Sequence, residues 1–280
     1  MTPIVNSSYA NALKKYDSFI NKYKSLVNEE ILKSAKETHK RNVSDLESDI
    51  NELKDNLNRL NSTDLPSDEL NTSIKEVSSE LKEKEDELSK IKQKALEDKI
   101  PIIMDDTLEV ISKILIEKKP ERILEIGAAV GYSAMCFSEY LSENGRIDTI
   151  ERDEQRAQEC RKNLKKVGVE DKINLYEGDA VEILPTLNEK YDIVFIDAAK
   201  GKYPFFLEQA LRMLKDDGVI FADNILYKGY VMSDYNKHKQ RTAVTHLREY
   251  IKETTENPEL QTEILEVGDG LAITRRRKEK

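Results

Sequence analysis

Hydrophobic residues in the second half of the chain form short runs that alternate with helical patterns. Five runs rich in strand-forming residues are bounded by turn residues, at 123–126, 146–151, 172–178, 191–197 and 218–224. Between them, polar stretches carry apolar residues at helical spacing, at 133–142, 153–167, 180–187 and 203–214. A helix, 107–118, precedes the first run. This alternation predicts an α/β fold, a doubly wound sheet of parallel strands.

The final segment breaks the alternation. Residues 262–276 contain two apolar runs joined by Gly268, Asp269 and Gly270, with no helix between them. Two strands linked by such a turn form an antiparallel hairpin. We therefore expect a seven-stranded, Rossmann-like sheet with a terminal antiparallel hairpin at its edge.

The first third of the chain has a different pattern. Apolar residues in 43–60 and again in 70–95 step by three and four, and Pro66 lies between the two runs. The heptad spacing predicts an antiparallel coiled-coil hairpin over 29–97, and a parallel intermolecular coiled coil is the alternative. Residues 1–28 predict an amphipathic helix that packs on a catalytic domain spanning 98–280. Partner docking, homodimerisation and substrate reach all remain open as roles for the hairpin.

Charge and composition narrow the class of protein. The chain carries 54 acidic and 45 basic residues, a net charge of −9, so any nucleic-acid contact requires a local basic patch. No apolar run reaches the roughly 20 residues that cross a membrane. Cys136 and Cys160 lack metal-binding spacing. We expect a cytoplasmic protein that does not bind membranes.

The glycine loop after the first strand indicates a nucleotide-like cofactor. Gly127 and Gly131 are separated by three residues rather than in the GxGxxG pattern, which argues against NAD. Glu125 is placed to accept from the ammonium of an amino-acid ligand, or else from a loop N–H group. Glu151 ends the second strand, where an acid receives a ribose diol. Gly178, Asp179 and Ala180 follow the third strand, where a purine edge would lie.

Three oxygen-bearing side chains end the next two strands. Asp197, Asp223 and Asn224 together suit Mg²⁺ or another hard divalent cation, although each of them could instead cap a helix. Lys200 could accept a proton or stabilise an anion beside that cation, or could be an exposed loop lysine. Such a group of residues would ionise a hydroxyl of a substrate beside the bound cofactor.

With these residues placed, the chain resembles the class I, metal-dependent O-methyltransferases of the catechol and caffeoyl-CoA type. Within them it is most similar to the bacterial tRNA 5-hydroxyuridine methyltransferases, through motifs such as LEIGAAVGYSA, FIDAAKGKYPFF and FADNILYKGYV. The resemblance covers approximately 10–32 and 95–275. It implies S-adenosylmethionine as methyl donor, Mg²⁺ at Asp197, Asp223 and Asn224, and Lys200 as the catalytic lysine. The residues implied to line the donor site are Ile103, Ser133, Glu151, Asp179, Ala180 and Asp197.

The same resemblance implies methylation of wobble 5-hydroxyuridine in the tRNA anticodon loop. A basic loop with Lys228, Lys237, Lys239 and Arg241, and a tail of basic residues at 275–278, are expected at the mouth of the active site to contact phosphates. Five aromatic residues are candidates to stack on a base: Tyr132, Tyr203, Phe205, Tyr227 and Tyr230. A small phenol as acceptor, and an interaction protein acting through the hairpin, remain the alternatives.

Overall fold

The computed structural model describes residues 84, 86–233 and 240–277, all of them in the compact unit that spans 78–280. The predicted N-terminal helix, most of the coiled-coil hairpin, Lys237 and Lys239 lie outside the described residues. The division into three domains, the hairpin's role and a homodimer therefore stay predictions. None of the helices in the described part of the chain is long and apolar enough to span a bilayer.

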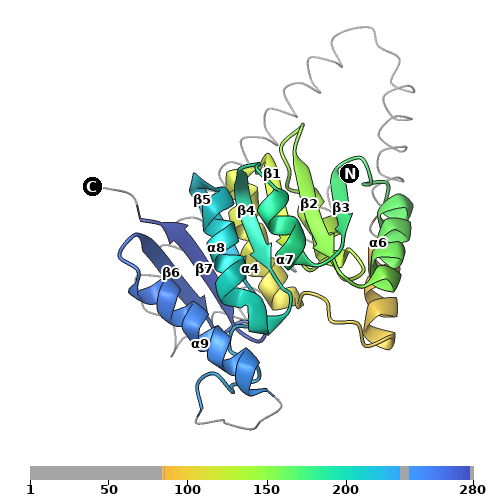
Figure 1. Ribbon diagram of the computed structural model, residues 1–280. Helices are drawn as coiled ribbons and strands as arrows, with labels where there is room; N and C mark the ends of the chain where they lie inside the picture. The colour runs from red at the N-terminus through yellow and green to blue at the C-terminus, as the bar shows by residue number, and fades with distance from the viewer. Residues whose placement is uncertain (1–83, 85, 234–239, 278–280) are drawn as a thin grey trace, which may run out of the picture. The chain divides into compact units, whose positions relative to one another are not determined.

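A seven-stranded sheet forms the centre of this unit (Figure 1). Its strand order is β3-β2-β1-β4-β5-β7-β6, and only β7 runs antiparallel to its neighbours β5 and β6. The prediction of a parallel sheet closed by a terminal hairpin is confirmed. The strands are β1 Arg122–Ile126, β2 Arg146–Glu151, β3 Ile173–Glu177, β4 Tyr191–Ile196, β5 Leu214–Ala222, β6 Leu260–Leu265 and β7 Leu271–Arg276.

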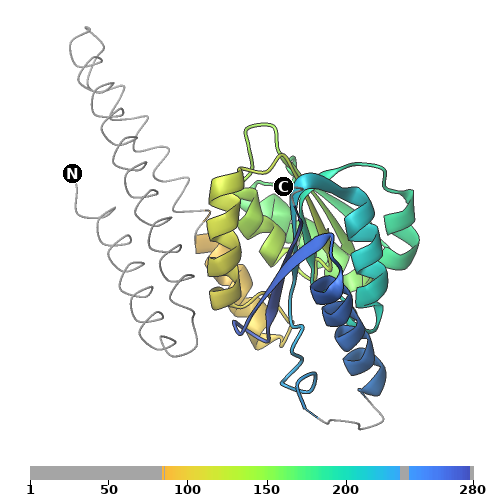
Figure 2. The ribbon, with the colours of Figure 1, turned by 90° about the vertical axis from the view of Figure 1, so that its left-hand side faces the viewer.

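Helices cover both faces of the sheet (Figure 2). One face carries α4 (Asp105–Lys118), α5 (Tyr132–Ser138) and α6 (Glu154–Val167). The other carries α7 (Ala180–Ile183), α8 (Tyr203–Met213) and α9 (Arg241–Glu256), with short 3₁₀ turns η1 (Leu184–Thr186) and η2 (Lys200–Lys202). The sequence interpretation placed no helix at α9. Its buried residues nevertheless recur at helical spacing, at Val244, Leu247, Tyr250 and Thr254.

The packing of the core explains why the strands could be predicted from apolar runs in the sequence. Because helices pack on both faces, the central strand β4 is buried on both sides, and Ile193 to Ile196 are at most 1% exposed. Phe195 meets Phe137 of α5 edge to face on one side. Such a strand is continuously apolar and rich in β-branched residues, which is the pattern that predicted it.

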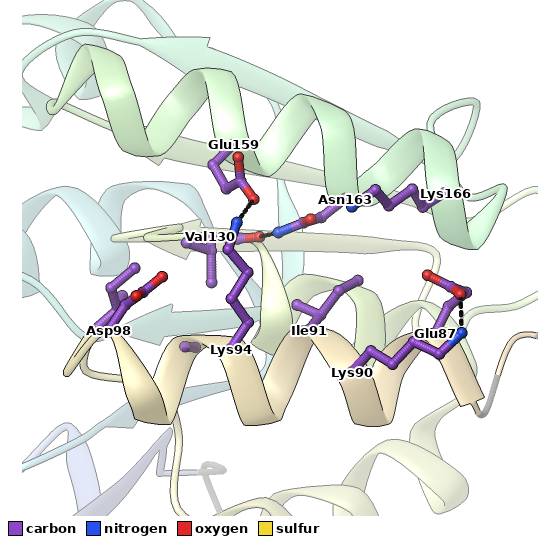
Figure 3. A pocket seen from close by; sticks show the side chains of 11 residues that line it. Glu87, Lys90, Ile91, Lys94, Asp98, Val130, Glu159, Asn163 and Lys166 are labelled. Atoms are coloured by element: carbon purple, nitrogen blue, oxygen red, sulfur yellow. Dashed lines mark hydrogen bonds and ion pairs between the residues drawn. The ribbon is translucent and has the colours of Figure 1, made fainter.

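Residues 86–97 form a helix that packs beside α6. Ile91 and Ala95 are 5% and 2% exposed, and they line a shallow groove with Val130 and Asn163 (Figure 3). An ion pair of 2.6 Å joins Lys94 to Glu159 on α6. Ile91 and Ala95 belong to the heptad pattern that predicted the hairpin. In this described part, their apolar spacing serves packing beside α6.

Candidate active site

The tips of β1 and β4 meet at a glycine that no other residue could replace without strain. Gly127 has φ +107°, and a Cβ there would lie 2.2 Å from the carbonyl oxygen of Asp197. The amide of Asp197 in turn donates to the carbonyl of Ile126 at 3.0 Å. This close approach brings the glycine loop and the first predicted metal ligand to one edge of the sheet.

A cleft of about 480 Å³ opens at this edge, a size ordinary for a small-molecule site. It lies at the carboxyl ends of the parallel strands, where α/β folds bind their ligands. Ten of the residues that were predicted for the donor, the metal or catalysis line it: Ile103, Gly127, Ser133, Glu151, Gly178, Asp179, Ala180, Asp197, Lys200 and Asn224. The structure therefore brings together residues that lie between position 103 and position 224 of the sequence.

Glu125 lies behind the cleft wall rather than in it. It is fully buried, and its two carboxylate oxygens accept from the hydroxyls of Ser133 and Thr149. The prediction that Glu125 itself meets the ammonium of the ligand is not supported by this placement. Because Ser133 does line the cleft, Glu125 holds the side chain that faces the ligand.

Burial raises the pKa of Glu125 from its ordinary value of 4.5 to about 7, and its hydrogen bonds to Ser133 and Thr149 only partly offset this. The folded protein therefore keeps a proton that the unfolded chain releases above pH 4.5. The stability due to this carboxyl is complete below that pH and is lost as the pH rises through 7.

We expect Glu125→Gln to flatten this dependence. Above pH 7 the free energy of unfolding of the variant should exceed that of the wild type by up to about 3 kcal/mol, and below pH 4.5 the two should be equal. Urea unfolding between pH 4 and pH 8 measures it, with the exposed Glu143→Gln as control. Parallel curves for Glu125→Gln and the wild type would show that Glu125 is ionised in the folded protein.

Glu151 and Asp179 organise the backbone around the cleft. Glu151 accepts from the amides of Ala129 and Asp153, both at 2.8 Å. Asp179 caps α7 by accepting from the amide of Val181 at 2.9 Å. A carboxylate has about four acceptor positions, so Glu151 retains capacity for a ribose diol while it fixes the loop.

Lys200 joins the tips of β4 and β5. Its ammonium donates to Asp197 Oδ1 at 3.0 Å and to Asn224 Oδ1 at 2.8 Å. Asp223 is 1% exposed and accepts from the amide of Asn224 at 2.7 Å. Burial, followed by the charge of Asp197, raises the pKa of Asp223 to about 7. One acid and one amide thus meet the ammonium of Lys200, and the second acid, Asp223, directly precedes Asn224 in the chain.

This donor set fits a hard divalent cation. In the described residues no three His, Cys, Asp or Glu side chains are grouped to hold a metal, so a site here needs the amide of Asn224 as its third protein ligand. Carboxylate and amide oxygens are the ligands that Mg²⁺ takes, with open positions for water or substrate. The ammonium of Lys200 stands between two of these oxygens, which shows that the site attracts positive charge.

Comparison of the chain with known proteins identifies its family. A model of the O-methyltransferase family matches residues 75–277. The chain belongs to this family. It is 35% identical over 118 residues to a catechol O-methyltransferase of Niastella koreensis, covering 41% of this chain and 53% of the relative. A caffeoyl-CoA O-methyltransferase of Populus kitakamiensis is 30% identical over 185 residues, covering 63% and 77%.

A solved structure supports the cofactor. The O-methyltransferase TomG of Streptomyces achromogenes, crystallised with S-adenosylmethionine, matches with a TM-score of 0.62 at 25% identity, over 69% of this chain and 91% of TomG. Together these matches identify an S-adenosylmethionine-dependent O-methyltransferase of the catechol and caffeoyl-CoA type. Which residues hold the donor and whether a metal takes part stay predictions.

The basic tail does not lie where this O-methyltransferase was expected to meet RNA. In the register of β7 on β5, Ala272 pairs with Ala222 beside the cleft, whereas Arg275 pairs with Val219. The tail therefore leaves from the opposite edge of the sheet. Arg276 donates to the carbonyl of Leu211 at 2.6 Å and so packs against α8. The prediction for Arg275 to Arg277 was wrong because β7 runs antiparallel.

The basic loop is only partly described. Lys228 is exposed, and its amide, not its ammonium, is held by Asp269 at 2.6 Å. Arg241 begins α9, whose first turn packs on η2: a Cβ at Gly201 would lie 3.9 Å from Thr242. Arg241 is exposed near the wall that carries Lys200. Neither Lys228 nor Arg241 lines the cleft itself.

Three basic residues of the cleft were missed in the sequence. Arg152, Arg156 and Lys202 all line it. Arg152 directly follows Glu151, and Lys202 lies two residues after Lys200, so a search around the strand ends could have found both. Arg156 lies in the first turn of α6, and only the packing of that helix brings it to the cleft.

Proposed function

We propose that this O-methyltransferase transfers the methyl group of S-adenosylmethionine to an ionisable hydroxyl of an acceptor that has a second oxygen on the neighbouring carbon atom. We also propose that the reaction uses Mg²⁺. The observation that carries the proposal is the meeting of Asp197, Asn224 and Lys200 in the wall of the donor cleft. Asp223, behind Asn224, completes the oxygen set.

The chemistry assigns a role to each group. The acceptor O–H bond breaks, a new bond forms from that oxygen to the methyl carbon, and the sulfur–methyl bond breaks to leave S-adenosylhomocysteine. Mg²⁺ on Asp197, Asp223 and Asn224 would lower the pKa of the acceptor hydroxyl. As an ammonium, Lys200 would stabilise the oxyanion while the released proton passes to water; in its neutral form, which a neighbouring Mg²⁺ would favour, it would take up that proton itself. The glycine loop would hold the donor for in-line attack.

The acceptor we propose is wobble 5-hydroxyuridine in the anticodon loop of tRNA, converted to 5-methoxyuridine. The basic residues Arg152, Arg156 and Lys202 in the cleft support it, because the donor itself carries no phosphate for them to bind. Arg241 and Lys228 extend positive charge beyond the cleft on an otherwise acidic chain. Lys237 and Lys239 complete the proposed RNA contact.

A small phenol is the second candidate. Relatives named catechol and caffeoyl-CoA O-methyltransferases favour it, and caffeoyl-CoA would also supply phosphates to the basic residues. One experiment separates the candidates. The protein is incubated with labelled donor, Mg²⁺ and either hydroxyuridine-containing tRNA, catechol or caffeoyl-CoA, and products are identified by mass spectrometry. 5-Methoxyuridine supports tRNA, whereas turnover of the phenols with no change in tRNA nucleosides rejects it.

Charge variants make a second prediction. We expect the double variant Lys228→Gln with Arg241→Gln to raise KM for tRNA several-fold and to weaken its salt dependence, because phosphate contacts release counterions. KM for catechol should not change. Arg275→Gln, at the opposite edge of the sheet, is the matched control and should leave both values at wild type. If the double variant and Arg275→Gln changed KM for tRNA equally, Lys228 and Arg241 would not contact the RNA.

A further inference from the structure

Tyr203, a candidate for stacking on a base, is unable to do so. Its side chain is 0% exposed at the start of α8, and it does not line the cleft. The ring packs edge-on against Tyr250 of α9, with centroids 5.7 Å apart, and beside Phe206. What remains to be explained is its hydroxyl, a polar group buried among aromatic rings.

The hydroxyl joins the two strand tips that carry the predicted metal ligands. It lies 2.7 Å from the backbone carbonyl of Asp223, after β5, and 3.3 Å from that of Ile196, at the end of β4. A phenol has one proton, and the shorter contact assigns it to Asp223. The hydroxyl oxygen is then left to accept.

Lys200 supplies the hydrogen bond that this oxygen accepts. Its Nζ lies 3.2 Å from the Tyr203 hydroxyl and 5.3 Å from the centre of the ring. With Asp197 and Asn224, Tyr203 is the third acceptor around the ammonium. Tyr203 stays neutral, because burial and the charges of Asp197 and Asp223 hold its pKa well above the ordinary value.

We infer that Tyr203 is a positioning residue for methyl transfer: its hydroxyl sets the place of the Lys200 ammonium relative to the tips of β4 and β5. The inference rests on the proposed role of Lys200. It adds a residue that never touches donor or acceptor and that acts through Lys200 alone. Its hydroxyl should therefore matter for turnover and not for donor binding.

Tyr203→Phe tests this, because it removes the hydroxyl and keeps the ring. We expect kcat to fall roughly ten-fold to a hundred-fold, as for a lost hydrogen bond to a charged group. KM for S-adenosylmethionine, and the affinity for S-adenosylhomocysteine measured by calorimetry, should not change. Tyr250→Phe is the matched control, since Tyr250 is equally buried and its hydroxyl has no hydrogen bond to Lys200 in the described structure. Equal kcat values for the two variants would overturn the inference.

A double-mutant cycle with Lys200→Met shows whether the Tyr203 hydroxyl positions the Lys200 ammonium or only supports the tips of β4 and β5. If Tyr203 acts through Lys200, Tyr203→Phe lowers kcat in the wild-type background and has no further effect in Lys200→Met. The same fold loss in both backgrounds would mean that the hydroxyl only supports the strand tips, and the inference would fail.

A spectroscopic measurement keeps this test independent of the acceptor. In protein labelled with ¹⁵N-lysine, the Lys200 Nζ signal is assigned by its loss in Lys200→Met. Tyr203→Phe should shift that signal and Tyr250→Phe should not. If no acceptor is methylated but the signal shifts, the proposed function fails while the contact of Tyr203 with Lys200 stands. An unshifted signal rejects the inference whatever the acceptor.

Discussion

Asp223→Ala should lower kcat by roughly a hundred-fold or more, since it removes a predicted ligand of the cation that ionises the acceptor. Asp223→Asn should be almost as inactive, although its amide oxygen can still accept from the amide of Asn224. Chelation with EDTA should abolish activity in the wild type, and added Mg²⁺ should restore it. Initial rates with saturating donor measure all three effects.

Asp216→Ala provides the matched control for this experiment. Asp216 lies on β5, the strand that Asp223 directly follows, but at the opposite end of that strand, and it is exposed. It should keep wild-type kcat. An Asp223→Ala enzyme as active as Asp216→Ala, or a wild type indifferent to EDTA, would show that methyl transfer here proceeds without the proposed metal.

Gly127→Ala should destabilise the fold and remove donor binding together. The position combines φ +107° with a Cβ 2.2 Å from the carbonyl oxygen of Asp197, so the tips of β1 and β4 would have to separate. Backbone strain and overpacking together cost about 3 kcal/mol. Urea unfolding measures the loss of stability, and calorimetry with S-adenosylhomocysteine measures the loss of affinity.

Gly168→Ala isolates the contribution of the backbone. Gly168 ends α6 with φ +71°, and a Cβ there would meet nothing within 4 Å. It should cost only about 1 kcal/mol, from the left-handed conformation, and leave donor affinity unchanged. Similar losses of unfolding free energy for the two variants would mean that the backbone at Gly127 and Asp197 can move apart without loss of stability.

Most of what the sequence predicted about the site came from residues at the ends of the strands. Glu151 ends β2, and Asp179 and Asp197 follow β3 and β4. Because all parallel strands point their carboxyl ends to one edge, reading the strand ends was enough to place these residues in one cleft. The same reasoning failed for Arg275 to Arg277, because it ignored the reversed direction of β7. It also placed Glu125 in the cleft, although burial puts it behind Ser133.

The sequence by itself determined the succession of strands along the chain and, apart from α9, that of the helices between them, the glycine turn after β1 and the identity of the side chains at each strand end. These are local properties: a strand buried on both faces has to be apolar, and a sharp turn with positive φ requires glycine. Only the tertiary structure decided which side chains behind those strand ends support the site. Tyr203 reaches Asp223 and Tyr250, and Glu125 reaches Thr149, through the packing of α8, α9 and β2, contacts between distant segments that no spacing in the sequence records.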